Sequence, residues 1–265
     1  MKGITMEGIH LSKIIEANEI NKKVQLDPQQ ELHILKDVDL IIEEGEFVSV
    51  MGPSGSGKST LLYNVSGMDR VTSGSVKFKD QEMTRLKEEE LAQIRLEKMG
   101  FIFQDINLLK NLSLIDNVMF PALVARDADK KAVYQKAKKL LQMTGIEKLA
   151  DNSIIQGSGG QLQRVGICRA LINDPEIIFG DEPTGALDSN ATEEIMSILA
   201  EINRKGTTIM IVTHDVKVAA KTERILFMVD GRIVAEKKMS KYDPERDHLK
   251  EREESIMKWL VENGF

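Results

Sequence analysis

The stretch GPSGSGKS, residues 52–59, fits the pattern G-x-x-x-x-G-K-[ST] in full. It directly follows the short apolar run from Phe47 to Met51, and helical spacing of apolar residues begins at Lys58. A glycine-rich turn between a strand and a helix can point backbone N–H groups inward, and the helix adds the positive end of its dipole. This is the context that a phosphate-binding loop requires. The stretch therefore predicts a nucleotide-binding α/β fold built around this turn.

The side chains of the same stretch indicate a chain of phosphates and a divalent cation. The Lys58 ammonium can reach β- and γ-phosphates as a point charge, and the Ser59 hydroxyl can ligate Mg²⁺. We expect the phosphate contacts to come from Gly52, Ser54, Gly55, Ser56, Gly57, Lys58, Ser59 and Thr60.

Composition narrows the class of protein. The chain has 265 residues and a formal net charge of −6, which argues against nucleic acid as a partner. Its single cysteine, Cys168, lies in an apolar-periodic segment, so we expect a core residue and a reducing compartment. We find no leader pattern at the start and no apolar run long enough to cross a bilayer, which predicts a cytoplasmic protein.

Short apolar runs and helical patterns alternate along the chain. Continuous apolar strands separated by helices predict a parallel sheet that is covered on both faces. The block from Leu112 to about Ile172 has helical spacing throughout and reads as a helical insertion. Strands are predicted at residues 47–51, 74–78, 101–103, 176–180, 207–212 and 225–229, with a hairpin turn at Asp230-Gly231 into 232–234.

Polar residues follow several of these strands. Asp181 and Glu182 end the apolar run IIFGDE, His214 follows Val212 and Thr213, and Gln104 follows Phe103. Ligands of parallel sheets sit beyond the carboxyl ends of the strands, so these side chains should lie beside the phosphate loop. There Asp181 and Gln104 could hold Mg²⁺, and Glu182 could activate a water molecule. We assign no role to His10, His33 or His248.

A second glycine-rich run, GSGG at residues 157–160, resembles a flexible linker. Helical spacing resumes directly after it, at Leu162, Val165, Cys168 and Leu171. We therefore interpret the run as a helix N-terminus with free N–H groups and a hydroxyl, which can bind a phosphate.

Five motifs in this order resemble the ATP-binding subunit of ABC transporters, over residues 35–238. They are GPSGSGKST, FIFQD, SGGQLQR, IIFGDEPTGALDS and IVTHD. The resemblance implies a P-loop NTPase with a RecA-like, mostly parallel sheet, an antiparallel β part and an inserted α-helical subdomain at about 107–172. It also implies an ATPase that uses ATP and Mg²⁺. We divide the chain into a nucleotide-binding domain, 1–240, and a helical tail, 241–265.

The resemblance also implies catalytic roles and partners. Glu182, His214 and Gln104 are the implied catalytic residues, and Ser59, Gln104 and Asp181 the metal-binding ones. A head-to-tail homodimer would enclose two ATP molecules. At each ATP the second copy would contribute Ser158, Gly159, Gly160 and Gln161, and Asp188 would lie at the interface between the two copies. An integral membrane permease would dock beside Gln104, which places the subunit on the cytoplasmic face of the cell membrane.

The motifs look like the bacterial branch that serves macrolide exporters, lipoprotein release and bacitracin resistance. A non-transport ABC ATPase of the cell-division type, which signals through a membrane partner, remains the alternative. A P-loop kinase does not account for SGGQ, GALD and THD together, and DNA-repair and ribosome-acting ABC proteins differ in the spacing or number of cassettes.

Two positions depart from the family pattern, and the tail has two alternative roles. Gly157 stands where the family usually has leucine, so we expect looser positioning of that loop. The family has an aromatic residue that stacks on adenine at about Ile15, which is not aromatic, while Tyr63 is interpreted as a core residue. The tail is expected either to dock on the domain or to form a dimer or partner contact.

Overall fold

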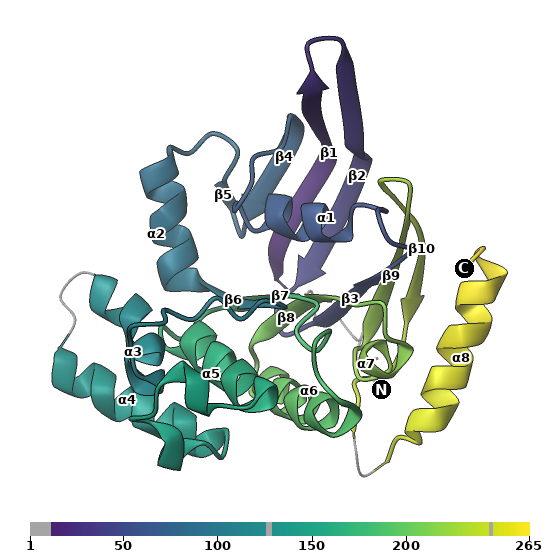
Figure 1. The fold of residues 1–265 in the computed structure, drawn as a ribbon. Coiled ribbons are helices and arrows are strands. Elements are labelled where there is room, and N and C mark those ends of the chain that lie inside the picture. Colours follow the sequence, from purple (N-terminus) through teal and green to yellow (C-terminus); the bar gives the residue numbers. More distant parts are fainter. Residues whose placement is uncertain (1–11, 126–128, 244–245) are drawn as a thin grey trace, which may run out of the picture.

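The computed structural model describes residues 12–125, 129–243 and 246–265, arranged as two β-sheets with helices between and around them (Figure 1). Four strands form an antiparallel sheet in the order β2-β1-β4-β5, and six form the central sheet in the order β10-β9-β3-β8-β7-β6. The strands are β1 (Lys13–Asp27), β2 (Gln30–Glu43), β3 (Phe47–Met51), β4 (Ser73–Phe78), β5 (Gln81–Glu82), β6 (Met99–Phe103), β7 (Ile177–Asp181), β8 (Thr208–Val212), β9 (Arg224–Val229) and β10 (Arg232–Lys238).

The central sheet is parallel except at one edge. Strand β3 pairs in parallel with β8 and β9, and β7 pairs in parallel with β8 and β6. Only β10 runs antiparallel, because the turn at Asp230-Gly231 returns the chain directly beside β9. This agrees with the predicted, mostly parallel sheet, although β6 begins at Met99, two residues before the expected start.

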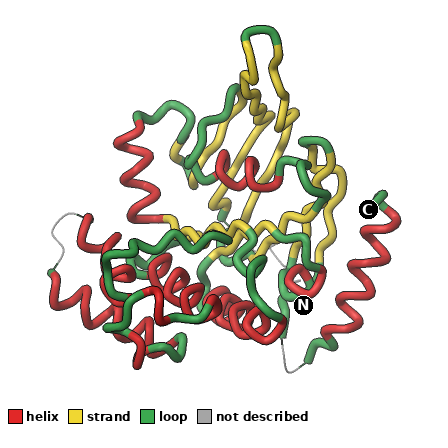
Figure 2. Tube along the Cα trace, in the orientation of Figure 1, coloured by secondary structure: helices red, strands yellow, loops and turns green. Residues whose placement is uncertain are grey.

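Helices flank the central sheet on both sides (Figure 2). The helices are α1 (Lys58–Val65), α2 (Glu88–Lys98), α3 (Leu114–Val124), α4 (Lys130–Met143), α5 (Gly159–Leu171), α6 (Ser189–Arg204), α7 (Val216–Ala219) and α8 (Leu249–Glu262), with 3-10 turns η1 (Glu147–Leu149) and η2 (Ile154–Gln156). Between residues 107 and 172 the described chain forms helices and turns and no named strand.

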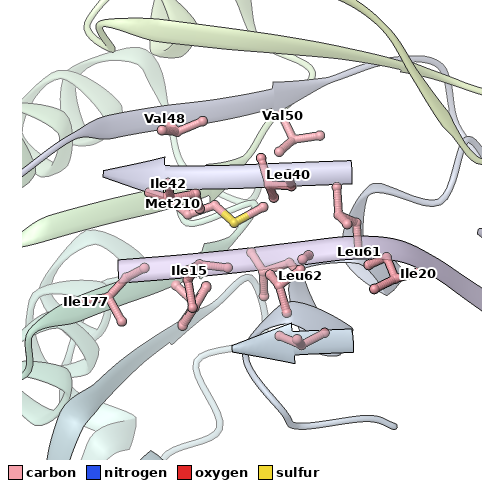
Figure 3. Close-up of a cluster of buried hydrophobic side chains, with 14 of the residues drawn as sticks. Ile15, Ile20, Leu40, Ile42, Val48, Val50, Leu61, Leu62, Ile177 and Met210 are labelled. Carbon is pink, nitrogen blue, oxygen red and sulfur yellow. The ribbon is translucent and has the colours of Figure 1, made fainter. Parts of the chain in front are cut away.

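One face of the central sheet is covered by α1 and the antiparallel sheet. Leu61 and Leu62 of α1 are buried between Ile15 of β1 and central-strand residues such as Val48 and Ile177 (Figure 3). Burying a side chain of this size contributes about 1.5–3 kcal/mol. This packing holds α1, and therefore the turn before it, rigidly against the end of β3. The long β1–β2 hairpin was not predicted as strands.

The opposite face is covered by α5 and α6, whose apolar side chains pack on alternate residues of the same strands. Ile178 and Ile209 face these helices, whereas Ile177 and Met210 face α1. Alternate burial on two faces explains why these strands read as continuous apolar runs.

The tail helix α8 docks beside α7 and β9. Ile256 and Leu260 are fully buried, and the ring of Trp259 packs edge-on against Phe227 at 6.2 Å between centroids. The inner face of the tail helix is therefore part of the core, which agrees with the expectation that the tail docks on the domain. Among the described helices, none combines the length and the apolar character that a membrane span needs.

Candidate nucleotide-binding and catalytic site

Four neighbouring strands bring the candidate residues to one edge of the central sheet. Strands β3, β8, β7 and β6 lie side by side and point the same way, so their carboxyl ends form a row. The loop after β3, His214 after β8, Asp181 at the end of β7 and Gln104 after β6 follow in that order. The sheet order alone therefore assembles residues that are up to 160 positions apart in sequence, counting roughly from 52 to 214.

A cavity of about 700 Å³ lies at this edge. That volume is within the range of small-molecule sites, about 300–1,000 Å³. Its walls are Leu32, His33, Ile34, Lys36, Gly52, Ser54, Gly55, Gly57, Lys58, Ser59, Thr60, Glu182, His214, Asp230 and Gly231.

Glycine is required at Gly52 for both space and conformation. A Cβ atom there would lie 2.1 Å from the carbonyl oxygen of Met228, and φ is +154°. Gly55 and Gly57 also have positive φ, at +79° and +98°, a region that side-chain-bearing residues seldom occupy. The loop therefore bends as tightly as a phosphate cradle demands.

Lys58 and Ser56 provide polar groups inside the loop. The Lys58 ammonium is largely buried and donates to the carbonyl oxygens of Gly52 at 3.0 Å and Pro53 at 2.9 Å. Burial lowers the pKa of Lys58, while the nearby carboxylates of Glu182 and Asp181 oppose that shift. The Ser56 hydroxyl is buried without a partner in the described chain, which leaves it free for a ligand.

Ser59 and Asp181 meet directly at the centre of the row. The Ser59 hydroxyl donates to Oδ1 of Asp181 at 2.7 Å, and the Tyr63 hydroxyl donates to Oδ2 at 2.6 Å. Burial and the adjacent carboxylate raise the pKa of Tyr63, so it remains a donor at neutral pH. Tyr63 packs against the core as predicted, but the sequence interpretation missed its contact with Asp181.

Glu182 and His214 form a second pair beside Lys58. Oε2 of Glu182 lies 3.1 Å from Nδ1 of His214, and because a carboxylate only accepts, Nδ1 carries the proton. The Glu182 backbone has φ +45°, an unusual conformation for a residue with a side chain. Strain of this kind is maintained where the surrounding structure fixes a residue, here through its N–H bond to the Val212 carbonyl at 3.1 Å.

Gln104 reaches the same place from β6. A Cβ atom built on Gly185 would lie 3.1 Å from Oε2 of Glu182 and 3.2 Å from Nε2 of Gln104. The amide and the carboxylate therefore converge over Gly185, where a water molecule could be oriented between them.

The residues present fit a Mg²⁺-bound triphosphate. Ser59, Asp181 and Gln104 offer hard oxygen donors, and Mg²⁺ usually takes one or two carboxylates and completes its shell with phosphate and water. The unpartnered Ser56 hydroxyl and the glycine cradle fit the phosphates. In the described ranges, no cluster of three or more His, Cys, Asp or Glu side chains is arranged for a metal held by protein alone.

The second glycine-rich run lies outside this cavity. Ser158 caps α5: its hydroxyl accepts from the Gln161 N–H at 3.4 Å, and the Gln161 side chain accepts from the Ser158 N–H at 2.9 Å. Asp188 caps α6 through the Ala191 N–H at 2.9 Å. Ser158, Gly159, Gly160, Gln161 and Asp188 are all absent from the cavity walls that the described residues form.

The sequence also missed the wall formed by β2. His33 and its neighbours line the cavity, whereas Ile15 is fully buried in the core between Ile42 and Phe78. The expectation that Ile15 marks the place of a base-stacking residue is therefore wrong. The sequence did contain a signal for this wall, because it predicts the hairpin turn at Asp230-Gly231. In the structure Gly231 bonds both Lys36 of β2 and Ser56 of the loop.

Comparison with known proteins now identifies the family. The family model described as "ABC transporter" matches residues 35–185. The chain belongs to the ABC transporter family. Membership confirms the predicted family, the P-loop fold and the enzyme class, an ATPase with ATP and Mg²⁺ as cofactors.

Individual relatives extend this match. The chain is 44% identical over 223 residues to the bacitracin export ATP-binding protein BceA of Halalkalibacterium halodurans, covering 83% of this chain and 87% of that protein. It is also 44% identical to the macrolide export ATP-binding/permease protein MacB of Aggregatibacter actinomycetemcomitans, covering 84% of this chain and only 34% of that larger protein.

A solved structure is similar over nearly the whole chain. The dimeric, post-hydrolysis state of the ATP-binding cassette MJ0796, bound to ADP and Pi, superposes with a TM-score of 0.80 at 40% identity. The match covers 86% of this chain and 100% of that one.

Proposed function

We propose that this ABC ATPase is the motor subunit of a transporter, works as a head-to-tail homodimer around two Mg-ATP, and drives a separate membrane permease. One observation carries the proposal. The cavity walls include the glycine loop, Ser59 and Glu182, and Ser59 donates to Asp181, while Ser158 caps a helix outside the cavity. The N-terminus of this helix, with the Ser158 hydroxyl, can bind a phosphate of the ATP that a second copy of the chain holds.

Within one copy, each side chain then has a distinct task. Lys58 neutralises phosphate charge, Ser59 and Asp181 hold the metal ion and its water, and Glu182 accepts a proton from the attacking water. His214 orients the Glu182 carboxylate through its Nδ1–H, and Gln104 positions water from the opposite side.

The permease contact is proposed for a groove beside Gln104. A cavity of about 380 Å³ lies between α2, β6 and α5, with Met68, Phe101 and Pro121 among its walls. Neighbouring apolar side chains on α3, including Phe120 and Val124, are exposed by 47% and 58%. Exposed apolar side chains gathered beside a groove mark a protein-binding surface. A short permease helix fits this surface, which would place the subunit on the cytoplasmic face of the membrane.

Export or antimicrobial-peptide resistance is the transport class that the relatives' names favour. Those names include bacitracin export and macrolide export. The cell-division alternative differs from it mainly in the membrane partner.

The Glu182→Gln variant tests the proposed site. It keeps the phosphate cradle and removes the base, so we expect ATP binding to persist, turnover to fall by at least about a hundredfold, and a dimer to accumulate with ATP. Gel filtration with light scattering reads out the dimer, and Lys58→Ala serves as the control that does not bind ATP. A Glu182→Gln chain that stays monomeric at saturating ATP contradicts the proposal.

Mixing two inactive variants tests whether the site is shared. Ser158→Arg chains keep an intact phosphate loop and Lys58→Ala chains keep an intact helix cap, so a mixed dimer has one complete site. We expect partial ATPase activity in the mixture and none in either variant alone. No recovery at any mixing ratio would contradict a site built from two copies.

A further inference from the structure

The helical block and the rest of the chain have opposite net charges. Residues 107–172 contain ten Lys and Arg and five Asp and Glu, which gives this block a formal charge of +5. The whole chain has a formal charge of −6, so the residues outside the block together carry −11. A charge asymmetry of this size within one chain indicates that the basic part contacts a negatively charged surface.

Helix α4 carries most of the positive charge of the block. Its 14 residues contain no Asp or Glu and include five lysines, Lys130, Lys131, Lys136, Lys138 and Lys139. Lys136 pairs with Asp174, and the Lys138 ammonium lies 3.6 Å from a carboxylate oxygen of Glu147. The other three lysines have no carboxylate partner in the part of the chain that the structure describes. The helix therefore presents cations that the protein does not neutralise.

The first turn of α4 indicates that these charges do not serve the stability of the helix. Lys130 and Lys131 are its first two residues, where the positive end of the helix dipole disfavours a cation. Helix α2 shows the favourable arrangement, with Glu88, Glu89 and Glu90 in its first turn. A local rule that is broken in this way is typical of a functional surface.

Three of the lysines lie on the outer face of α4. The inner face packs into the helical block through the apolar residues Val133, Ala137, Leu140 and Leu141. With 3.6 residues per turn, Lys131, Lys138 and Lys139 project from the opposite side of the helix. They line neither the nucleotide cavity nor the groove beside Gln104. This outer face is therefore a row of long cationic side chains on a convex surface.

Helix α4 lies next to the surface that we propose for the permease. It packs against α3, whose exposed Phe120 and Val124 lie beside the groove near Gln104 (Figure 1). A permease helix in that groove brings this side of the molecule to the bilayer, a step that rests on the proposed function. A convex row of lysines suits an extended layer of phosphate headgroups, whereas peptides are usually held in grooves.

We propose that the outer face of α4 binds anionic lipid headgroups beside the permease, through Lys131, Lys138 and Lys139. The subunit is then held at the membrane by two weak contacts, the permease groove and this basic face. Because both are on one rigid block, each contact raises the effective concentration for the other.

Vesicle flotation of the full chain tests the lipid contact without the permease. Vesicles of phosphatidylcholine alone are compared with vesicles that also contain phosphatidylglycerol. At about 0.1 M salt the Debye length is about 10 Å, so carboxylates far from α4 are largely screened. We expect the protein to bind the vesicles that contain phosphatidylglycerol and not those of phosphatidylcholine alone.

A triple variant removes the three charges of the outer face. A lysine near an anionic surface changes binding about fivefold, so Lys131→Gln, Lys138→Gln and Lys139→Gln together should lower the partition coefficient about a hundredfold. Glutamine and lysine have similar helix propensities, so α4 should persist, which far-UV circular dichroism checks. The single variant Lys139→Gln, with an expected loss of about fivefold, replaces the triple variant if the latter does not fold.

A second triple variant controls for net charge. Lys238→Gln, Lys250→Gln and Lys258→Gln remove the same number of exposed cations outside the helical block. Because these lysines lie away from α4, we expect this variant to bind vesicles that contain phosphatidylglycerol as the parent does.

The outcomes separate the lipid contact from the proposed function. Equal binding to the two kinds of vesicle, equal losses in the two triple variants, or no binding to either vesicle would overturn the lipid contact; the last result would point to an acidic protein segment instead. ATP binding and ATP-dependent dimer formation, measured in chains that also carry Glu182→Gln, test the proposed site separately. We expect the α4 variant to retain both.

Discussion

Replacing Arg252 with methionine should release α8 from the body of the protein. Arg252 is buried, with 7% of the residue exposed. It donates to the carbonyl oxygens of Ala220 at 2.6 Å, Thr222 at 2.9 Å and Ser240 at 3.0 Å, and it pairs with Asp247. Ala220 and Thr222 follow α7, so this one guanidinium fastens the tail helix to the segment that comes after His214.

Two limits bracket the size of the effect. Hydrogen bonds from a charged donor contribute about 1.5–3 kcal/mol each, so three lost bonds would cost about 5–9 kcal/mol if the carbonyls stayed buried. They need not stay buried, because α8 can undock and let water reach them. Undocking exposes Ile256 and Leu260, at about 1.5–3 kcal/mol each, which limits the loss to about 3–6 kcal/mol. We therefore expect α8 docking to weaken by about 3 kcal/mol.

Amide hydrogen exchange measures this loss locally. A change of about 3 kcal/mol should lower the protection of α8 amides by roughly a hundredfold and leave β7 and β8 protected as before. Lys250→Met is the matched control, because Lys250 lies on the exposed side of the same helix. Unchanged α8 protection in Arg252→Met would refute the assignment of Arg252 as the fastening residue.

Two further variants test the site and the core. Gly185→Ala places a methyl group against Glu182 and Gln104, so we expect kcat to fall about tenfold or more while ATP affinity is retained. Steady-state kinetics measure kcat, and a binding assay measures the affinity. An equal loss of ATP affinity would contradict this expectation. Burial raises the pKa of Cys168 from 9.0 to about 12, so the folded state keeps a proton that the unfolded state loses. The free energy of unfolding therefore keeps this contribution below pH 9 and loses about 1.4 kcal/mol of it per pH unit between 9 and 12. In denaturant titrations at pH 8–10.5, the free energy of unfolding should decline less steeply for Cys168→Ala than for the unmodified protein. Parallel curves would contradict this.

The convergence of the candidate residues at one edge of the central sheet was predictable because it depends on sheet topology. Asp181, His214 and Gln104 each follow a buried strand, and parallel strands end at a common edge. The motifs and the strand pattern together place these residues without coordinates. The contacts in the structure, such as Ser59 to Asp181 at 2.7 Å, add only the geometry.

The β2 wall of the cavity was not predictable because it depends on the register of a long, irregular hairpin. The β1–β2 pairing shifts register at several points between Lys13 and Asp27. Each shift changes which side chains face the cavity, so counting positions from the start of β1 led to Ile15, which is a core residue. His33 reaches the cavity instead because the turn at Gly231 draws β2 against the loop.

Gly157 illustrates how a departure from a family pattern can be compensated nearby. Sequence reasoning expected a looser loop because leucine is missing before Ser158. In the structure Gly157 is the residue before the cap of α5, and Leu162 is at the position with which such a residue forms a hydrophobic staple. A Cβ atom on Gly157 would lie 2.6 Å from Cδ2 of Leu162, so the Leu162 side chain already occupies that space.

The helix cap next to Gly157 is also complete without a leucine. Ser158 and Gln161 bond each other reciprocally across the first turn of α5, and five residues earlier the Ser153 N–H donates to Oε1 of Gln156 at 2.9 Å. Gly157 itself has ordinary extended angles, with φ −92° and ψ 141°, so no backbone strain is relieved by glycine there. The bonds between Ser158 and Gln161, and the Leu162 side chain beside Gly157, therefore hold this loop, which argues against the loosening that the missing leucine suggested.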